Sequence, residues 1–214
     1  MICVSLGNIE SRKALQIAEN AEMIEIRADL LEKDERLIEE LLDMKVKKIF
    51  TCRPGKLPKK KREALFLLAL QKNANYIDVE FESETAFSSE ISRLVKGTET
   101  DLIISYHDFE RTPPLENLEK IYDQCFEMGA DLAKIATMIQ SKDDIFNLFS
   151  LYRKEKRKVI IGMGQLGLIT RIAAVTLGSE FTFVSPATGE RTAPGQVTDN
   201  EMKTILRILN NHKK

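Results

Sequence analysis

The sequence predicts an α/β protein with a single domain over residues 1–214, built as an eight-stranded parallel (β/α)8 barrel. Eight short runs have the composition of β-strands, helical segments separate them, and 214 residues suit the smaller barrels of this kind. Strands that alternate with helices pair in parallel, because a helical crossover joins each strand to the next. A doubly wound open sheet is the alternative, and it is weakened because no G-x-G-x-x-G motif follows the first run.

The predicted strands are short and rich in Ile, Val, Phe and Tyr. In chain order they cover residues 2–6, 23–29, 48–52, 76–81, 101–107, 132–137, 159–164 and 181–186.

The intervening segments have helical character. SRKALQIAEN begins at Ser11, a candidate N-cap, and SKDDIFNLFSLYRK begins at a second one, Ser141. KKKREALFLLALQKNA is rich in strong helix formers. LENLEKIYDQCFEMGAD has its apolar residues on one helical face, and Gly129 lies where a left-handed residue would end the helix.

Composition favours a cytoplasmic protein without nucleic-acid or membrane partners. The net charge is −1, so the basic excess that favours nucleic-acid binding is missing. No apolar run reaches the roughly 20 residues that span a bilayer, and the apolar N-terminal stretch is too short for a signal peptide. Three widely spaced cysteines indicate reduced thiols, and two histidines make a His-based zinc site unlikely to form.

Polar residues inside the predicted strands are the first functional signal. Both strand faces of a closed barrel are covered, so a charge there lies near the mouth, is paired, or costs several kcal/mol in desolvation. In MIEIRAD, Glu25, Arg27 and Asp29 share one face by the two-residue period and are expected to point inward. Glu25 and Arg27 can then partly neutralise each other. A structural ion pair that fills the barrel is the alternative.

Lys134 and His107 are the candidate catalytic residues. Lys134 lies within the strand-like run DLAKIATM, where burial penalises the charged amine, and a neutral amine can form a Schiff base with a ketone. The alternative is a structural lysine paired with Glu25 or Glu80. His107 lies at the C-terminal end of its strand, where a barrel carries its catalytic groups, although a lone histidine is often inert.

Two arginines and one loop are candidates for substrate binding. Arg53 follows the third strand, and Arg171 lies near the start of the helix after the seventh, where a bidentate guanidinium suits a carboxylate. The loop TGERTAPGQV can present backbone N–H groups and the Gln196 amide. A surface arginine and a solvated loop are the alternatives.

The motifs EIRAD, TCR, IDVE, SYHDF, AKIA, GMG…TR and APGQ occur in this order at the ends of the predicted strands. With them the chain resembles the type I 3-dehydroquinate dehydratase family over nearly its whole length. The resemblance implies a (β/α)8 barrel, usually a homodimer, that needs no metal or nucleotide cofactor. It also implies the dehydration of 3-dehydroquinate to 3-dehydroshikimate in the shikimate pathway.

The resemblance also implies a role for each candidate residue. Lys134 would form the imine, and His107 would take the proton from the neighbouring carbon and help to expel the hydroxyl as water. Glu25 and Arg27 would hold substrate hydroxyls and support His107, and Arg171 would bind the substrate carboxylate. The remaining pocket residues would be the polar Arg53, Thr192 and Gln196, with Met163 and Phe183 packed against the substrate ring.

The sequence departs from the family pattern at two positions. Many members carry a glutamate four residues after the arginine of the third strand, where it can orient the histidine, but this chain has Leu57 there. Glu25 is therefore expected to orient His107. Thr192 stands where many members have serine, and its hydroxyl can make the same hydrogen bond.

Two other functions remain open at this point. Another class I aldolase-type barrel, acting on a sugar phosphate through a lysine Schiff base, would need a glycine-rich phosphate cradle such as GMGQLG. A ligand-binding or scaffold barrel without catalysis is the other, because barrels carry many functions.

Overall fold

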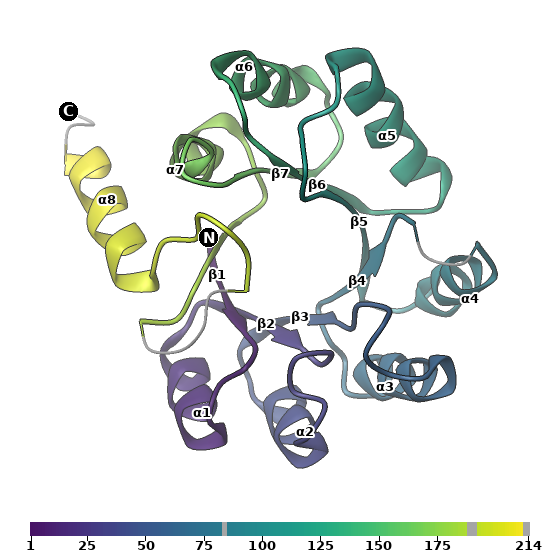
Figure 1. The fold of residues 1–214 in the computed structure, drawn as a ribbon. Helices are drawn as coiled ribbons and strands as arrows, with labels where there is room; N and C mark the ends of the chain where they lie inside the picture. Colours follow the sequence, from purple (N-terminus) through teal and green to yellow (C-terminus); the bar gives the residue numbers. More distant parts are fainter. Residues whose placement is uncertain (83–84, 188–191, 212–214) are drawn as a thin grey trace.

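The computed structural model describes residues 1–82, 85–187 and 192–211. Within them, parallel strands form one sheet in the order β7-β6-β5-β4-β3-β2-β1-β8. The strands are β1 Ile2–Leu6, β2 Met23–Arg27, β3 Lys47–Thr51, β4 Tyr76–Glu80, β5 Asp101–Asp108, β6 Leu132–Met138, β7 Lys158–Met163 and β8 Thr182–Val184. Because β8 pairs with β1, the sheet curls into a nearly closed barrel, as predicted (Figure 1).

The helices surround this barrel and follow the strands one by one (Figure 1). They are α1 Ser11–Asn20, α2 Glu35–Asp43, α3 Lys59–Gln71, α4 Thr85–Val95, α5 Leu115–Glu127, α6 Lys142–Ser150, α7 Leu168–Leu177 and α8 Asp199–Asn211, with a 3-10 turn at Leu151–Arg153. None of the helices in the described ranges is long and apolar enough to cross a membrane.

Local signals explain where several helices begin and end. Ser141 caps α6 through a reciprocal capping box with Asp144, and Gly129 after α5 has φ +95°, so both expectations are confirmed. The expected Ser11 cap is wrong, because Glu10 occupies the N-cap position. Ser11 instead donates a hydrogen bond of 2.5 Å to Asp34, the N-cap of α2, and so links the starts of two neighbouring helices.

Two predicted strands are shorter in the structure. β2 ends at Arg27, because the chain turns there and the Arg27 carbonyl accepts hydrogen bonds from the amides of Leu30 and Leu31. β8 has only three residues, Thr182–Val184. The other predicted strands agree with the observed ones within one or two residues, the usual uncertainty of an element end.

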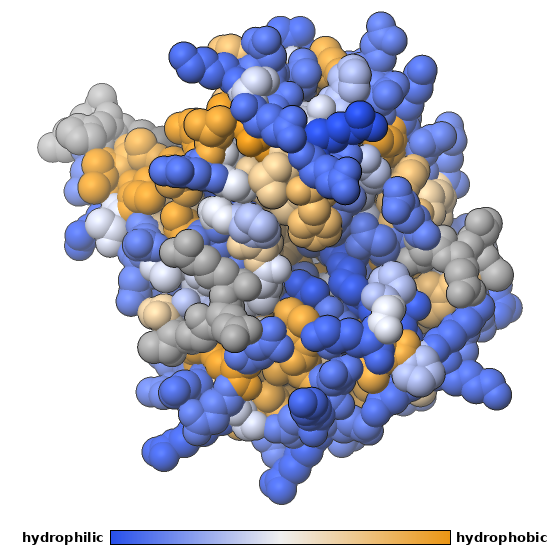
Figure 2. All heavy atoms as spheres, in the orientation of Figure 1, coloured by the Kyte–Doolittle hydropathy of each residue, from blue (hydrophilic) through white to orange (hydrophobic). Residues whose placement is uncertain are grey.

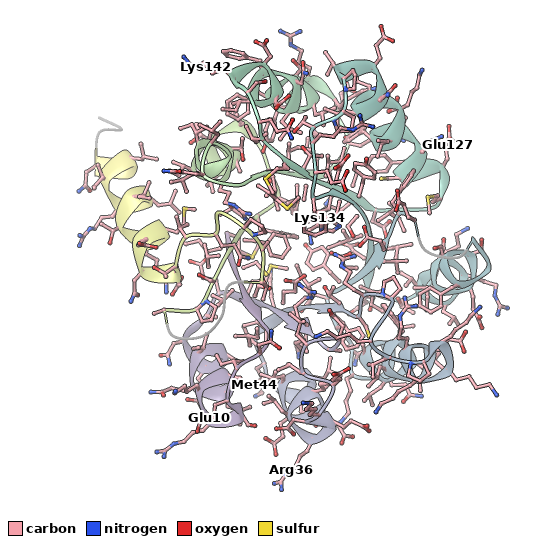
Figure 3. All side chains as sticks on the ribbon, viewed as in Figure 1. Glu10, Arg36, Met44, Glu127, Lys134 and Lys142 are labelled. Carbon is pink, nitrogen blue, oxygen red and sulfur yellow. The ribbon has the colours of Figure 1, made fainter. Side chains whose placement is uncertain are left out.

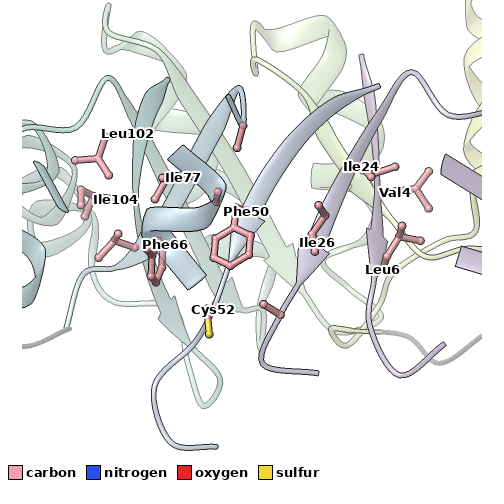
Figure 4. Packing of buried hydrophobic residues seen from close by; sticks show 14 of the residues in the cluster. Val4, Leu6, Ile24, Ile26, Phe50, Cys52, Phe66, Ile77, Leu102 and Ile104 are labelled. Carbon is pink, nitrogen blue, oxygen red and sulfur yellow. The ribbon is translucent and has the colours of Figure 1, made fainter. Parts of the chain in front are cut away.

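Two apolar cores flank the sheet. The larger lies between strands and helices, where Phe50 of β3 meets Phe66 of α3 edge to face at 5.2 Å (Figure 4). The smaller fills the barrel interior with inward residues such as Met23, Ile49 and Ile103. In β2 the inward-facing residues are Met23, Glu25 and Arg27 in chain order, so the strand is apolar at its start and charged towards its end. The polar side chains therefore gather at the C-terminal ends of the strands.

Candidate active site

The polar ends of the strands enclose a cavity of about 460 Å³. In the view along the barrel, hydrophilic residues gather near the centre of the face, beside apolar ones (Figure 2). The cavity lining includes all ten residues that the sequence singled out: Glu25, Arg27, Arg53, His107, Lys134, Met163, Arg171, Phe183, Thr192 and Gln196. Side chains that sequence reasoning did not select also line it, among them Glu80, Glu82 and Phe109.

Lys134 points from β6 into the middle of the barrel and is 4% exposed (Figure 3). Its Nζ lies 2.9 Å from Oδ2 of Asp78, 3.8 Å from Oε1 of Glu25, and 4.3 Å from the centre of the Phe183 ring. The two carboxylates compensate a positive charge on the amine. Of the two partners that the sequence suggested for Lys134, Glu25 is present at the longer distance and Glu80 is not a partner. The nearest carboxylate to the Lys134 nitrogen is that of Asp78.

Asp78 is the main residue that sequence reasoning missed. Its side chain is fully buried, accepts a hydrogen bond from Oγ of Ser105 at 2.5 Å, and lies 3.0 Å from Nη1 of Arg53. Burial would raise the pKa of this carboxyl, but the charges of Arg53 and Lys134 outweigh burial and hold the pKa well below its usual range. The available signal was the alternation in YIDVE, which places Asp78 and Glu80 on one face of β4.

Glu80 orients His107, so the expectation that Glu25 does so is wrong. Oε1 of Glu80 lies 2.9 Å from Nδ1 of His107. The barrel explains the difference, because β4 pairs directly with β5, whereas β3 and β4 separate β2 from β5. Glu25 instead accepts hydrogen bonds from Ser5 and from Oγ1 of Thr51, the latter at 2.9 Å.

The surroundings of His107 favour a neutral imidazole. Burial and the charge of Arg53 lower its pKa, and together they outweigh the opposing effect of Glu80. A carboxylate only accepts hydrogen bonds, so Nδ1 carries the proton and donates it to Glu80. Nε2 then keeps its lone pair and can act as a base. The Phe109 ring stacks beside the imidazole at 5.9 Å and 11°.

Arg53 bridges the partners of the two candidate catalytic residues. Its Nη1 lies 2.7 Å from Oε2 of Glu80 and 3.0 Å from Oδ1 of Asp78, and it donates to Oγ of Ser105 at 2.7 Å. Burial would lower the pKa of this guanidinium, but the carboxylates of Asp78 and Glu80 raise it, so Arg53 is a permanent cation.

Arg27 is not paired with Glu25 as the sequence suggested. Its Nε and Nη2 donate to the two oxygens of Asp29 at 3.0 and 2.7 Å, a bidentate fork that forms because β2 ends and the chain turns after Arg27. Glu25 and Arg27 of the EIRAD motif nevertheless both line the cavity, and Asp29 is bound to Arg27.

Arg171 is a buried cation with no carboxylate partner among the described residues. It is 1% exposed, and within the described ranges it donates only to the carbonyls of Phe183 at 3.4 Å and Pro194 at 3.3 Å. Its Nε has no hydrogen-bond partner in the described structure. Burial lowers its pKa to about 10, so it stays charged at neutral pH. A buried guanidinium with an unused donor at a cavity wall suits an anionic ligand.

The loop before α8 is described from Thr192 onwards, and its first residues, 188–191, lie outside the described residues. Oε1 of Gln196 accepts hydrogen bonds from the amides of Thr192 and Ala193, at 2.9 and 3.2 Å. The Gln196 side chain therefore shapes its own loop, although it was expected to offer its amide to a substrate. The Thr192 hydroxyl donates to Oγ of Ser5 at 2.9 Å and ties the loop to β1.

The glycines of GMGQLG serve close backbone packing. A Cβ atom at Gly167 would lie 2.4 Å from the Gly162 carbonyl, and one at Gly195 would lie 2.3 Å from the Gly164 oxygen. The first approach lies within the loop before α7, and the second brings that loop against the loop before α8. Close backbone packing therefore explains these glycines, and a phosphate-binding role is not needed to explain them. No group of three or more His, Cys, Asp or Glu side chains in the described ranges is arranged to hold a metal ion.

Comparisons with known proteins show the family of the chain. A sequence model of the type I 3-dehydroquinase family matches residues 2–213. The 3-dehydroquinate dehydratase of Methanocaldococcus jannaschii is 37% identical, over 98% of this chain and 99% of its own, and that of Methanococcus maripaludis strain S2 is 35% identical, over 98% and 100%.

Solved structures of 3-dehydroquinate dehydratases are also similar to this chain. The crystal structure of 3-dehydroquinate dehydratase from Aquifex aeolicus superposes with a TM-score of 0.83 at 30% identity, covering 99% of both chains. The Geobacillus kaustophilus 3-dehydroquinate dehydratase superposes with a TM-score of 0.85 at 26% identity, covering 100% of this chain and 92% of its own. Taken with the match over residues 2–213, these similarities show that the chain belongs to the type I 3-dehydroquinase family.

Proposed function

We propose that this protein is a hydro-lyase that dehydrates 3-dehydroquinate to 3-dehydroshikimate through a Schiff base on Lys134. The observation that carries the proposal is a buried lysine at a cavity that also holds a histidine whose Nδ1 is bound by a carboxylate. The lysine supplies a nucleophile for a ketone, and the histidine supplies a base at its free Nε2.

Imine formation is the first chemical stage. The Lys134 ammonium passes a proton to Nε2 of His107, and the free amine adds to the substrate ketone. The carbinolamine takes that proton back as it loses water, which leaves a protonated imine and a neutral His107. This cation withdraws electrons from the neighbouring carbon and so acidifies its C–H bond. Nε2 of His107 then takes that proton, and the electron pair of the C–H bond forms an enamine.

Loss of the hydroxyl completes the dehydration. The lone pair of the enamine nitrogen re-forms the protonated imine, and the electrons of the enamine C=C bond form a new C=C bond to the carbon that bears the hydroxyl. The hydroxyl leaves from that carbon as water, with the proton from Nε2 of His107. Hydrolysis of the protonated imine by one water then releases 3-dehydroshikimate and restores the Lys134 ammonium. The water used here balances the water lost in imine formation, so the net change is the loss of one water from the substrate.

The other cavity residues would bind the substrate. Arg171 is assigned to the substrate carboxylate, because it is a buried cation whose Nε has no partner among the described residues. Glu25 and Arg27 are assigned to substrate hydroxyls. The remaining positions assigned to the pocket are the polar Arg53, Thr192 and Gln196 and the apolar Met163 and Phe183, all of which line the cavity.

The family resemblance supports two further proposals. The protein would act as a homodimer, and it would work in the cytoplasm as a biosynthetic enzyme. Sedimentation equilibrium of the full chain tests the first, because a monomer mass at micromolar concentration would contradict it.

Trapping with borohydride tests the Schiff base. Reduction in the presence of 3-dehydroquinate should fix the ligand's mass on the peptide that carries Lys134, because the reduced imine is a stable secondary amine. Lys134→Arg is the matched control, since it keeps the charge but cannot form the imine. An adduct on another lysine, or none on the wild-type protein, would refute the assignment.

The same samples separate this proposal from the two alternatives. Formation of the conjugated enone should be visible as strong ultraviolet absorbance with 3-dehydroquinate. A sugar-phosphate aldolase would instead cleave its substrate without this absorbance. A scaffold or ligand-binding barrel would bind carboxylates equally well in the wild-type protein and in Lys134→Arg and would turn nothing over.

A further inference from the structure

We propose that Asp78 is a positioning residue, which holds Nζ of Lys134 in the cavity and balances the positive charge of that nitrogen both before and after imine formation. The inference rests on the proposed Schiff-base function. It assigns a role to a residue that had none from the sequence alone, although Asp78 stands in the motif IDVE, and that does not line the cavity.

The contacts of Asp78 fix its carboxylate on both oxygens. Oδ2 lies 2.9 Å from Nζ of Lys134 and 3.2 Å from Nη2 of Arg53. Oδ1 accepts from Oγ of Ser105 at 2.5 Å and lies 3.0 Å from Nη1 of Arg53. Since the side chain is fully buried, no water competes for these positions, and turning the carboxylate would break several charged contacts at once.

Other carboxylates are less suited to this role. Glu25 lies 3.8 Å from Nζ, and its oxygens are already bound by Ser5 and Thr51. Glu80 is held between His107 and Arg53. Asp78 is therefore the acid in hydrogen-bond contact with the lysine nitrogen.

The charge on the nitrogen explains why a fixed carboxylate suits this reaction. An ammonium and a ketone combine to give a protonated imine and one water, and the nitrogen carries one positive charge on both sides of this step. Asp78 can thus stabilise the imine without moving, which is the advantage of an electrostatic partner that is oriented in advance. The enamine nitrogen is neutral, so Asp78 also favours the return to the cationic imine when the hydroxyl leaves.

Arg53 links the surroundings of Lys134 to those of His107. It contacts both Asp78 and Glu80, and these acids contact Lys134 and His107 respectively. The two catalytic side chains are therefore joined by one chain of charged contacts, Lys134–Asp78–Arg53–Glu80–His107. Removing the charge of Asp78 should therefore affect the charge balance of Lys134 first, because Lys134 is in direct hydrogen-bond contact with it.

Asp78→Asn tests the inference, with Ser105→Ala as the matched control. The serine change removes one hydrogen bond of Asp78 and no charge. In Asp78→Asn the rate of borohydride trapping should become half-maximal at a lower pH, because the ammonium loses its nearest carboxylate. The kcat should fall about ten- to hundred-fold, as expected for loss of a hydrogen bond to a charged group. Ser105→Ala should keep the wild-type pH dependence.

Each outcome has a distinct reading. A pH dependence of trapping in Asp78→Asn that matches Ser105→Ala would overturn the inference and leave Asp78 as a structural partner of Arg53. Absence of trapping in the wild-type protein would refute the proposed function instead. If Asp78→Asn does not fold, Asp78→Glu replaces it: the charge remains, so the half-maximal pH should stay, while the extra methylene should displace Nζ and slow trapping. Unchanged trapping in Asp78→Glu would equally overturn the positioning role.

Discussion

Glu80 shows how much one side chain decides at this site. Its two oxygens hold Nδ1 of His107 and Nη1 of Arg53, at 2.9 and 2.7 Å. The first contact sets the tautomer of the imidazole, and the second keeps the carboxylate charged, since the positive charge of Arg53 outweighs burial and lowers its pKa. We looked for such an acid at position 57, where this chain has Leu57, and the structure supplies it from β4 instead.

Glu80→Gln should therefore lower kcat by about ten-fold, because the ring loses its charged hydrogen-bond partner. The acid limb of the pH profile should move to lower pH, since Glu80 acts to raise the pKa of His107. Glu82→Gln is the control, as Glu82 is an exposed acid that lines the same cavity. Steady-state kinetics between pH 5 and 8 measure both effects, and an unmoved acid limb would contradict the assigned partner.

At the scale of elements, neighbouring strands and loops bring the site together. β4 supplies Asp78 and Glu80 to the side chains of β6 and β5, and it can do so because parallel register aligns the C-terminal ends of all three strands. The loop that contains Thr192 is held by several contacts, and two of them tie it to neighbouring elements. One is the hydrogen bond to Ser5, and the other is the backbone contact between Gly195 and Gly164.

Gly195→Ala should loosen this loop. Gly195 has φ +72°, and an added Cβ would lie 2.3 Å from the Gly164 carbonyl oxygen, so the loop must shift. We expect the stability to fall by about 1–2 kcal/mol and the KM to rise several-fold, with little change in the yield of trapped Lys134 at saturating substrate. Gly97→Ala is a useful control, because Gly97 also has a positive φ, +84°, but a Cβ there meets nothing within 4 Å. Equal KM values for the two variants would contradict a role of this contact in binding.

For the whole molecule, the barrel separates an apolar interior from a charged mouth. The inner core, with Met23, Ile49 and Ile103, supports the lower part of the cavity, and the ionised side chains lie above it. Placing these charges in a partly buried space is tolerated because four of them, on Arg27, Arg53, Glu80 and Lys134, have an opposite charge within hydrogen-bond distance. Because these groups are ionisable, the free energy of unfolding depends on pH.

The free energy of unfolding should fall as the pH is lowered. The folded-state pKa values of His107, Glu80 and Asp78 are all lowered, so the unfolded chain binds more protons than the folded one. The contribution of His107 is fully present above its unfolded pKa of about 6.5 and is lost as the pH falls through the folded value. The losses from Glu80 and Asp78 begin near their unfolded values of about 4.3 and 3.9.

Urea unfolding at pH 7.5, 5.5 and 4.0 measures this dependence. His107→Gln should show a smaller loss of stability between pH 7.5 and 5.5 than the wild-type protein, because the variant lacks the group that titrates there. A wild-type stability that rises on acidification to pH 5.5 would contradict the lowered pKa of His107.

The sequence alone determined the barrel and most of the cavity, because both depend on periodicity. Alternating strands and helices fix a parallel barrel, and polar residues at strand ends must meet at its mouth, so all ten selected residues line one cavity. The partners of those residues were decided only by the tertiary structure. Whether Glu25 or Glu80 binds His107, and whether Arg27 pairs with Glu25 or Asp29, depends on which strands are neighbours and where each one turns. Asp78 was overlooked for the same reason, since a carboxylate's partner is set by distances across the barrel that no local pattern records.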